Sequence, residues 1–306
     1  MGVIVVEGLR KRYGHVQAVS DVSFEVEAGE VFALLGPNGA GKTTTVEILE
    51  GFRRRDGGRV EVLGFDPADR SAFSHLRERT GIVLQELAVE PYLTVREVLR
   101  RNAGYYPAPR DLTEVIELVG LTEKARAKVK TLSGGQMRRL DLGLGIVGNP
   151  EILYLDEPTT GFDPSARRDA WQVVRGLTTG GTTVILTTHY MDEVEALATR
   201  VAVMSGGRIV ASGTPQSLGG RETSEAVIRF RLPEGLAAAD LPVQPTECCG
   251  EHVAIHTPDP LPALRLLANW AADNCVDLPA LTCERPTLED VYLRLVGYGA
   301  SQGGRQ

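Results

Sequence analysis

The segment GPNGAGKTT at residues 36–44 constrains the fold more than any other part of the sequence. It directly follows the apolar run VFALL and is directly followed by a helical pattern. Its glycines let successive backbone N–H groups point at one anion, and the positive end of the helix dipole adds to the attraction. Lys42 is placed to contact the β- and γ-phosphates of a nucleoside triphosphate, and the Thr43 hydroxyl to bind Mg²⁺. The residues predicted to hold the nucleotide are Gly36, Pro37, Asn38, Gly39, Ala40, Gly41, Lys42, Thr43 and Thr44.

A phosphate loop of this kind occurs in kinases, GTPases, helicases and motor ATPases. A GTPase also needs an N-K-x-D element that reads the base, and the sequence contains none. The GTPase class is therefore disfavoured, and the remaining classes must be separated by other motifs.

A pair of acids follows the apolar run ILYL in the segment EILYLDEPTTGFD at residues 151–163. The run predicts a strand buried on both faces. Asp156 comes directly after it, at the edge where open α/β sheets hold their ligands, and is therefore a candidate to hold Mg²⁺ through a water molecule. Glu157 can reach another side of the γ-phosphate, which makes it the candidate general base for an attacking water.

Two further polar residues stand at predicted strand ends. His189 follows the run VILTT, and Gln85 ends the run GIVLQ. Strand ends of a parallel sheet meet at one edge, so His189 is predicted to lie beside the γ-phosphate and Gln85 near the metal and the attacking water. Both are candidate catalytic residues, and Gln85 is also a candidate metal ligand. Gln85 begins the helical stretch that follows and is placed to report the nucleotide state to it.

A second glycine motif, LSGGQ at residues 132–136, opens another predicted helix. Ser133 is predicted to cap this helix, with Gly134 and Gly135 exposing backbone N–H groups at its start. The motif cannot serve the phosphates that Lys42 binds, because the loop at 36–44 already surrounds them. A plain helix cap is the alternative reading of a bare S-G-G, but the five-residue string is much more specific.

The chain as a whole is predicted to have an α/β fold. Short β-branched runs alternate with helical patterns up to about residue 213, which favours a mainly parallel sheet with helices on both faces and an early antiparallel β subdomain. A stretch with helices and no convincing strand, about 86–149, predicts a helical subdomain inserted into this P-loop NTPase core. The predicted division is an ATPase domain at 1–215, a linker at 216–222, a small α+β accessory domain at 223–298 and a disordered tail at 299–306.

The accessory domain holds all four cysteines, Cys248, Cys249, Cys275 and Cys283. Two histidines at 252 and 256 complete the pattern CC-x2-H-x3-H, so a metal site is conceivable. Adjacent cysteines chelate one metal poorly and no CxxC pair is present, so reduced, partly buried thiols are predicted instead. A third strand of this domain is predicted at residues 276–281, and its last helix around residues 287–296.

Composition excludes several classes of protein. The net charge of −7 argues against nucleic acid as a partner and against attachment to lipid by charge alone. No apolar run reaches the length of a membrane span, and the start MGVIVVEG lacks the features of a secretory signal, so a cytosolic protein is expected.

Taken together, the motifs resemble the nucleotide-binding subunit of an ATP-binding cassette (ABC) transporter. The elements stand in the family's order: Tyr13 in KRYG, GPNGAGKTT, Gln85, LSGGQ, ILYLDEP, GFD and His189. The resemblance implies a head-to-tail dimer that holds two ATP molecules, each between the phosphate loop of one copy and the LSGGQ of the other. It also implies that Tyr13 stacks on adenine and that Asp163 couples the two sites. The LSGGQ motif would bind the partner's nucleotide through Ser133, Gly134, Gly135 and Gln136. Of these, Ser133 and Gly135 would reach the partner's γ-phosphate. Phe162 and Asp141 differ from the residues that are commoner in this family at these positions. Neither is a predicted catalytic residue.

The string RPTLEDVYLRLVG at residues 285–297 resembles the C-terminal extension of bacterial drug-resistance ABC exporter subunits. That branch implies ATP hydrolysis that powers export of a drug, lipid or other hydrophobic compound through a separate membrane permease, with the chain at the cytoplasmic face of the membrane. Leu288, Val291 and Leu295 give the string an apolar face, which packs either on its own domain or on a partner. The alternative function is a soluble ABC ATPase that acts in translation or DNA repair. The transported compound is left open.

Overall fold

The computed structural model describes residues 2–83, 89–233 and 236–302 of this 306-residue chain. The described residues form two compact units, one extending to Pro215 and including the residues from Tyr298 onward, and the other covering Gln216–Gly297. Each unit has its own hydrophobic core.

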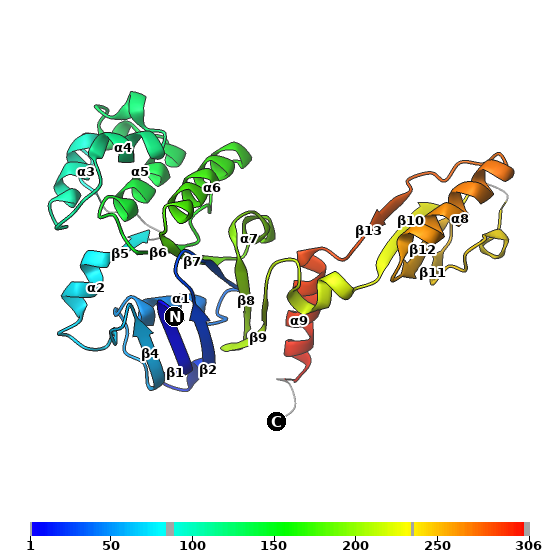
Figure 1. Cartoon of the computed structure of the whole chain (residues 1–306), viewed down its shortest axis with the longest axis horizontal. Helices are drawn as coiled ribbons and strands as arrows, with labels where there is room; N and C mark the ends of the chain where they lie inside the picture. Colours follow the sequence, from blue (N-terminus) through cyan, green and yellow to red (C-terminus); the bar gives the residue numbers. More distant parts are fainter. Residues whose placement is uncertain (1, 84–88, 234–235, 303–306) are drawn as a thin grey trace. The chain divides into compact units, whose positions relative to one another are not determined.

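The first unit is built on a six-stranded sheet (Figure 1). Its four central strands are mostly buried, and all neighbours pair in parallel except the last two, which pair antiparallel. Alternate side chains of each strand point to opposite faces of the sheet, so a run buried on both faces needs cover on both. In spatial order the strands are β5 (Thr80–Val83), β6 (Ile152–Asp156), β7 (Thr183–Thr188), β3 (Val31–Leu35), β8 (Arg200–Ser205) and β9 (Arg208–Gly213).

A smaller antiparallel sheet has the order β2 (Val16–Val26), β1 (Ile4–Tyr13) and β4 (Gly57–Val62). Its apolar face shares one core with helix α1 (Lys42–Leu49) and with one face of the larger sheet. Within that core the rings of Phe24 and Phe32 stack at 4.9 Å between centroids, which ties the two sheets together. The phosphate loop therefore starts from a strand and ends in a helix that are both buried in the same core.

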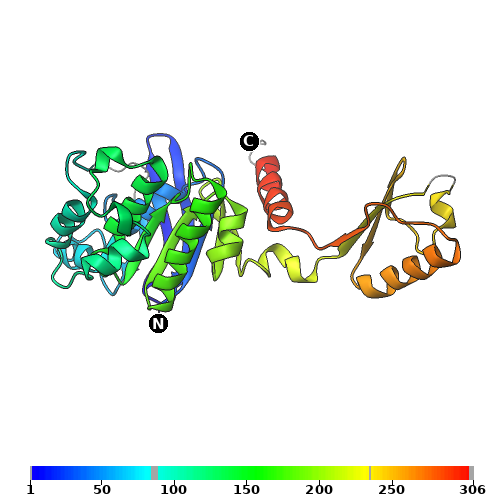
Figure 2. The same ribbon diagram turned by 90° about the horizontal axis from the view of Figure 1, so that it is seen from above.

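The other face of the larger sheet is covered by helices α6 (Pro164–Thr179) and α7 (Met191–Leu197), which Figure 2 shows from above. Between β5 and β6 lie α3 (Val95–Ala103), α4 (Leu112–Leu118) and α5 (Gly134–Ile146), grouped together in Figure 1. They pack closely, since a Cβ at Gly143 of α5 would lie 3.4 Å from Leu99 of α3 and 3.6 Å from Val115 of α4. The predicted α/β fold with a helical insert is confirmed.

Helix α2 (Phe73–Arg79), of which only Leu76 is buried, was not predicted from the sequence. Strands β1 and β2 are long, at 10 and 11 residues, and their pairing contains register shifts.

The second unit holds a four-stranded antiparallel sheet, one face of which is covered by helix α8 (Pro260–Asp273). Ile228, Phe230, Val253 and Ile255 of the sheet pack against Ala263 and Leu267 of the helix. The strands, in spatial order, are β11 (Glu247–Cys249), β12 (His252–Thr257), β10 (Ala226–Arg231) and β13 (Thr282–Glu284).

Two predictions for this unit were wrong. Residues 276–281 are not a strand, because Pro279 has no N–H to donate and Ala280 has a φ of 58°, so β13 forms only after them. All four cysteines are free and exposed rather than partly buried. A 3₁₀ helix, Leu218–Thr223, begins within the stretch predicted as a linker, and the last helix is α9 (Leu288–Gln302).

Among residues 2–83, 89–233 and 236–302, no helix combines the length and the apolar character that crossing a bilayer requires.

Candidate functional site

The loop between β3 and α1 can form only with glycine at two of its positions. A Cβ at Gly36 would come within 2.4 Å of the Met204 carbonyl oxygen. At Gly41, which caps α1, φ is 101° and a Cβ would lie 2.4 Å from the Ala18 carbonyl oxygen. A side chain at either position would force backbone apart, so the two glycines let the loop pass closely between neighbouring segments.

An open pocket of about 570 Å³ lies over this loop. Its lining joins the loop to the end of β1, the start of β2 and the end of β6, so residues distant in sequence face one space. Tyr13 and Glu157 stand in it together with the loop. The lining residues are Tyr13, Val16, Gln17, Ala18, Asn38, Gly39, Gly41, Lys42, Thr43, Thr44 and Glu157.

Lys42 is the buried cation of the loop. Its Nζ donates hydrogen bonds to the carbonyl oxygens of Gly36 and Pro37, at 2.7 and 3.2 Å. Burial lowers the pKa of Lys42, and the nearby carboxylates of Glu157 and Asp156 oppose that shift. The Lys42 ammonium therefore lies at the loop with two carboxylates nearby. This combination suits a site that binds a phosphate next to a metal ion.

Asp156 was predicted to follow a strand directly and is the last residue of β6, and Thr187 of the neighbouring strand β7 donates a hydrogen bond to its carboxylate. Burial raises the pKa of Asp156 more than this hydrogen bond lowers it, and Glu157 raises it further. Thr187 was not predicted from the sequence. A buried hydroxyl needs a partner, but Thr183 and Thr188 of the same buried strand give the same signal, so the sequence does not single out Thr187.

Glu157 follows directly and has an unusual backbone, with a φ of 47°. Its N–H donates to the Thr187 carbonyl oxygen at 3.0 Å. Its carboxylate lies 3.3 Å from His189 Nδ1 and accepts a hydrogen bond from the Thr160 hydroxyl at 3.4 Å. Glu157 and His189, each predicted to lie beside the γ-phosphate, are thus close to one another, whereas Gln85 lies outside the described residues.

The LSGGQ motif begins α5, and Ser133 is its N-cap. The Ser133 hydroxyl accepts the N–H of Gln136 at 3.3 Å, and the Gln136 side-chain oxygen accepts the N–H of Ser133 at 3.1 Å. This is a capping box, which satisfies two backbone donors at the helix start. None of the four residues 133–136 lines the pocket over the phosphate loop.

The two glycines of LSGGQ are not required by the chain that contains them. A Cβ at Gly134 or Gly135 would meet no atom within 4 Å, and neither residue has a positive φ. Ser133 and Gly134 are exposed. The two glycines leave the start of α5 without side chains, so its backbone N–H groups are not covered by them.

Asp163 is the N-cap of α6 rather than a member of the pocket lining. Its Oδ1 accepts the N–H groups of Ser165 and Ala166, both at 2.9 Å, and these bonds hold the pKa of Asp163 below its ordinary value. The residue predicted to couple two sites is thus ionised and fixed at the start of a helix.

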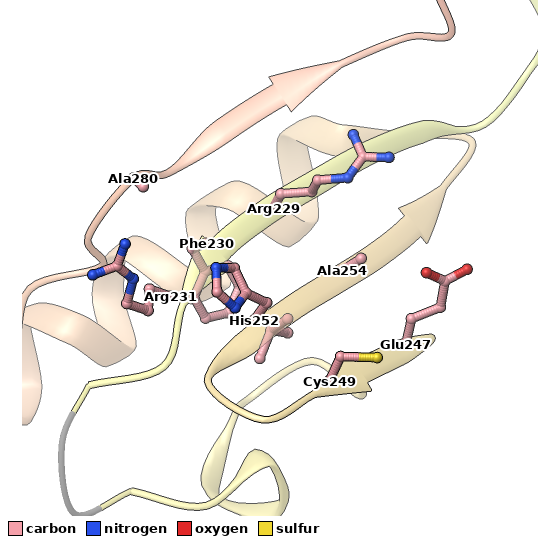
Figure 3. A pocket seen from close by; sticks show the side chains of 9 residues that line it. Arg229, Phe230, Arg231, Glu247, Cys249, His252, Ala254 and Ala280 are labelled. Atoms are coloured by element: carbon pink, nitrogen blue, oxygen red, sulfur yellow. The ribbon is translucent and has the colours of Figure 1, made fainter. Parts of the chain in front are cut away.

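The second unit has a pocket of about 210 Å³ on the sheet, shown in Figure 3. Arg229 and Arg231 of β10 and His252 of β12 line it, with Glu247 and Cys249 of β11 opposite. Among the residues that the structure describes, no group of three or more His, Cys, Asp and Glu side chains is placed to hold a metal ion. The pattern CC-x2-H-x3-H therefore does not converge there.

Comparison with known proteins places these features in a family. A family model described as ABC transporter matches residues 19–160, and one described as ABC transporter domain-containing protein-like, C-terminal domain, matches residues 226–287. The chain is 37% identical over 304 residues to the daunorubicin resistance ATP-binding protein DrrA3 of Streptomyces coeruleorubidus, covering 96% of each chain. It is 40% identical over 300 residues to a Nod factor export ATP-binding protein I of Burkholderia thailandensis, covering 94% of this chain and 95% of the other.

Solved structures resemble the first unit. The cbiO1 protein of Clostridium perfringens, part of the ABC transporter complex cbiONQ, matches with a TM-score of 0.64 and 28% identity. The match covers 71% of this chain and 90% of that one.

Proposed function

Because this chain belongs to the ABC transporter family, as an ATP-binding and ATP-hydrolysing subunit of the drug-resistance and export type, we propose that it powers export through a separate membrane-spanning subunit. The proposed cargo is a drug, a lipid or another hydrophobic compound. The chain would act at the cytoplasmic face of the membrane, where ATP is available, held there by the membrane subunit. The helical insert, α3 to α5, is the part proposed to contact that subunit.

The observation that carries this proposal is the extent of the likeness. It covers both units, including the small C-terminal domain, and not the nucleotide-binding unit alone. The relatives named for daunorubicin resistance and for Nod factor export share this two-unit chain. An ABC ATPase subunit of another type would be expected to match such proteins over its nucleotide-binding unit only.

Within the site, we propose that Lys42 and the loop N–H groups bind the β- and γ-phosphates of ATP, and that Tyr13 stacks on the adenine. The Thr43 hydroxyl and the Asp156 carboxylate offer the oxygen donors that Mg²⁺ prefers, and Mg²⁺ would neutralise charge on the β- and γ-phosphates. Glu157 is the proposed general base, and His189, 3.3 Å from its carboxylate, is proposed to contact the γ-phosphate. Gln85 is proposed to contact the metal and the attacking water.

We further propose that each ATP is bound between two copies of the chain arranged head to tail. The exposed capping box of α5 and its two unexplained glycines support this, because they are built for close approach yet do not line the chain's own pocket. Ser133 and Gly135 would then contact the partner's γ-phosphate, and Asp163 would couple the two ATP sites.

Recovery of the chain from membranes of its own organism tests the transport proposal. With an affinity tag on the chain and mild detergent, we expect one integral membrane protein to be recovered in stoichiometric amount. That protein should stimulate ATP hydrolysis when the two are reconstituted in vesicles. Recovery of ribosomes or DNA with no integral membrane protein would instead favour the translation or DNA-repair alternative.

Replacing Tyr13 by alanine should weaken ATP binding. Stacking of a base on an aromatic ring contributes about 1–3 kcal/mol, so the Kd should rise roughly 5- to 150-fold. Tyr13 is 38% exposed at the pocket, with Lys11 and Arg53 each 5.4 Å from its ring centroid. Titration with a fluorescent ATP analogue measures the change.

Tyr13→Phe keeps the ring and should bind like the parent chain. A matched control is Tyr92→Ala, which removes another exposed tyrosine under a lysine, Lys130, outside the lining of this pocket. Equal affinity of the Tyr13→Ala and parent chains would remove adenine stacking from the proposed site.

A further inference from the structure

Arg138 of α5 reaches the loop that carries the proposed general base. Its Nη2 donates to the carbonyl oxygen of Glu157 and its Nε to the carbonyl oxygen of Pro158, both at 3.3 Å. Its Nη1 donates to Asp141, three residues along the same helix, at 3.0 Å. The side chains of Arg138 and Asp141 are 13% and 6% exposed, so the bonds are formed largely out of water. Burial strengthens such charge-assisted contacts.

The backbone of Glu157 needs to be held. Its φ of 47° lies in the left-handed region, which is strained for a residue with a side chain. The next residue is Pro158, and a proline pushes the residue before it toward extended backbone. Two neighbours oppose this tendency: Thr187 of β7 accepts the Glu157 N–H, and Arg138 of α5 donates to the Glu157 carbonyl.

Helix α5 is firmly seated at its other end. A Cβ at Gly145 would lie 2.6 Å from Val83 of β5, and a Cβ at Gly81 would lie 2.0 Å from the Gly145 carbonyl oxygen. So close an approach leaves the helix little room to move relative to β5. One rigid helix therefore carries Ser133 at its exposed start, Arg138 at the loop of the general base, and a close contact with the sheet at its end.

We infer that Arg138 is a positioning residue. It fixes the backbone of Glu157, and so the direction of the Glu157 carboxylate, relative to the helix that starts at Ser133. This inference rests on the proposed role of Glu157. Arg138 does not itself line the pocket over the phosphate loop, but it contacts the backbone of Glu157, which does. A displacement of Ser133 by the partner's nucleotide would reach Glu157 through one helix and two hydrogen bonds.

The double variant Arg138→Met with Asp141→Leu tests the inference in the purified full-length chain. It removes Arg138 and Asp141 together, so neither of the two charges is left buried without the other. We expect kcat to fall roughly 10- to 100-fold, because a displacement of a catalytic group by about 1 Å can have that effect. KM and the Kd for ATP should stay within about twofold of the parent values, and ATP should still induce dimers.

A double-mutant cycle with Glu157→Gln separates positioning from other roles. If Arg138 acts through Glu157, the Arg138 and Asp141 changes should lower the remaining rate of Glu157→Gln no further. Multiplied effects would overturn the inference, and so would a kcat near that of the parent or a loss of ATP-induced dimers. A lower melting temperature with ATP affinity and kcat reduced together would indicate a purely structural role.

Two more variants guard against misfolding and general damage. Arg138→Lys keeps a cation beside Asp141 but cannot span both carbonyls, so it should also lower kcat with ATP affinity unchanged. The matched control is Arg175→Met, because Arg175 of α6 likewise donates two N–H groups to a backbone carbonyl, that of Ala196, away from the site. It should leave kcat unchanged. These assays need no membrane subunit, so their failure would leave the transport proposal standing.

Discussion

Replacing Glu157 by glutamine is expected to lower the rate of ATP hydrolysis by roughly 10²–10⁴-fold while leaving ATP bound. Glutamine keeps the shape of the side chain but cannot accept a proton from water at neutral pH. Since Lys42 and the loop are unchanged, the nucleotide should still bind, and dimers formed with ATP should persist instead of separating. Single-turnover hydrolysis and size-exclusion chromatography with ATP and Mg²⁺ measure the two effects.

Glu151→Gln is the matched control. Glu151 directly precedes the same strand β6, at its opposite end, and its half-exposed side chain pairs with Arg79 rather than with any group of the pocket. It should hydrolyse ATP like the parent. Turnover of Glu157→Gln at nearly the parent rate would show that the base is another group, and His189 would be the first to examine.

The parts of the site that lie within one continuous segment could be predicted from the sequence. The loop at 36–44 is defined by its glycines and its lysine, and Asp156 by its place after a buried run. Both depend on a strand, a turn or a helix start that neighbouring residues determine. His189 could be placed near Glu157 because their strands, β6 and β7, end at one edge of the same sheet.

Residues that act through tertiary contact could not be predicted in this way. Thr187 looks like one more β-branched residue of a strand, and its bond to Asp156 follows only from the pairing of β6 with β7. Arg138 reads as an ordinary charged residue of an amphipathic helix. Its bonds to the carbonyls of Glu157 and Pro158 depend on how α5 packs against the loop after β6.

The fold of the second unit was predicted less well because its signals are weaker. Strands β11 and β13 are three residues each and have no buried residue, so no apolar run marks them. The run VDLPAL did suggest a strand, but its proline and the left-handed Ala280 place the pairing segment further along the chain. Apolar periodicity predicts elements that bury a face, and these strands bury none.

Replacing Ser133 by arginine is expected to abolish hydrolysis, with ATP binding by the isolated chain unchanged. The pocket over the phosphate loop contains no residue of LSGGQ, so the chain's own affinity for ATP should be preserved. A bulky cation at the start of α5 would block the close approach that Gly134 and Gly135 permit. The substitution also removes a capping box, at a cost of about 1 kcal/mol. Thr94→Arg controls for that loss, because Thr94 and Glu97 form the same kind of cap on α3, and it should leave hydrolysis intact.

A mixture of two inactive chains then tests whether the site is shared. Lys42→Ala disables the phosphate loop, and Ser133→Arg disables the opposing helix. In a head-to-tail dimer of one chain of each kind, one site contains both defects, and the other combines the intact loop of one chain with the intact LSGGQ of its partner. Hydrolysis should therefore reappear on mixing, although neither chain has it alone. If dimers of the two chains form without hydrolysis, or if the Ser133→Arg chain by itself fails to bind ATP, then LSGGQ serves its own loop and the shared site is wrong.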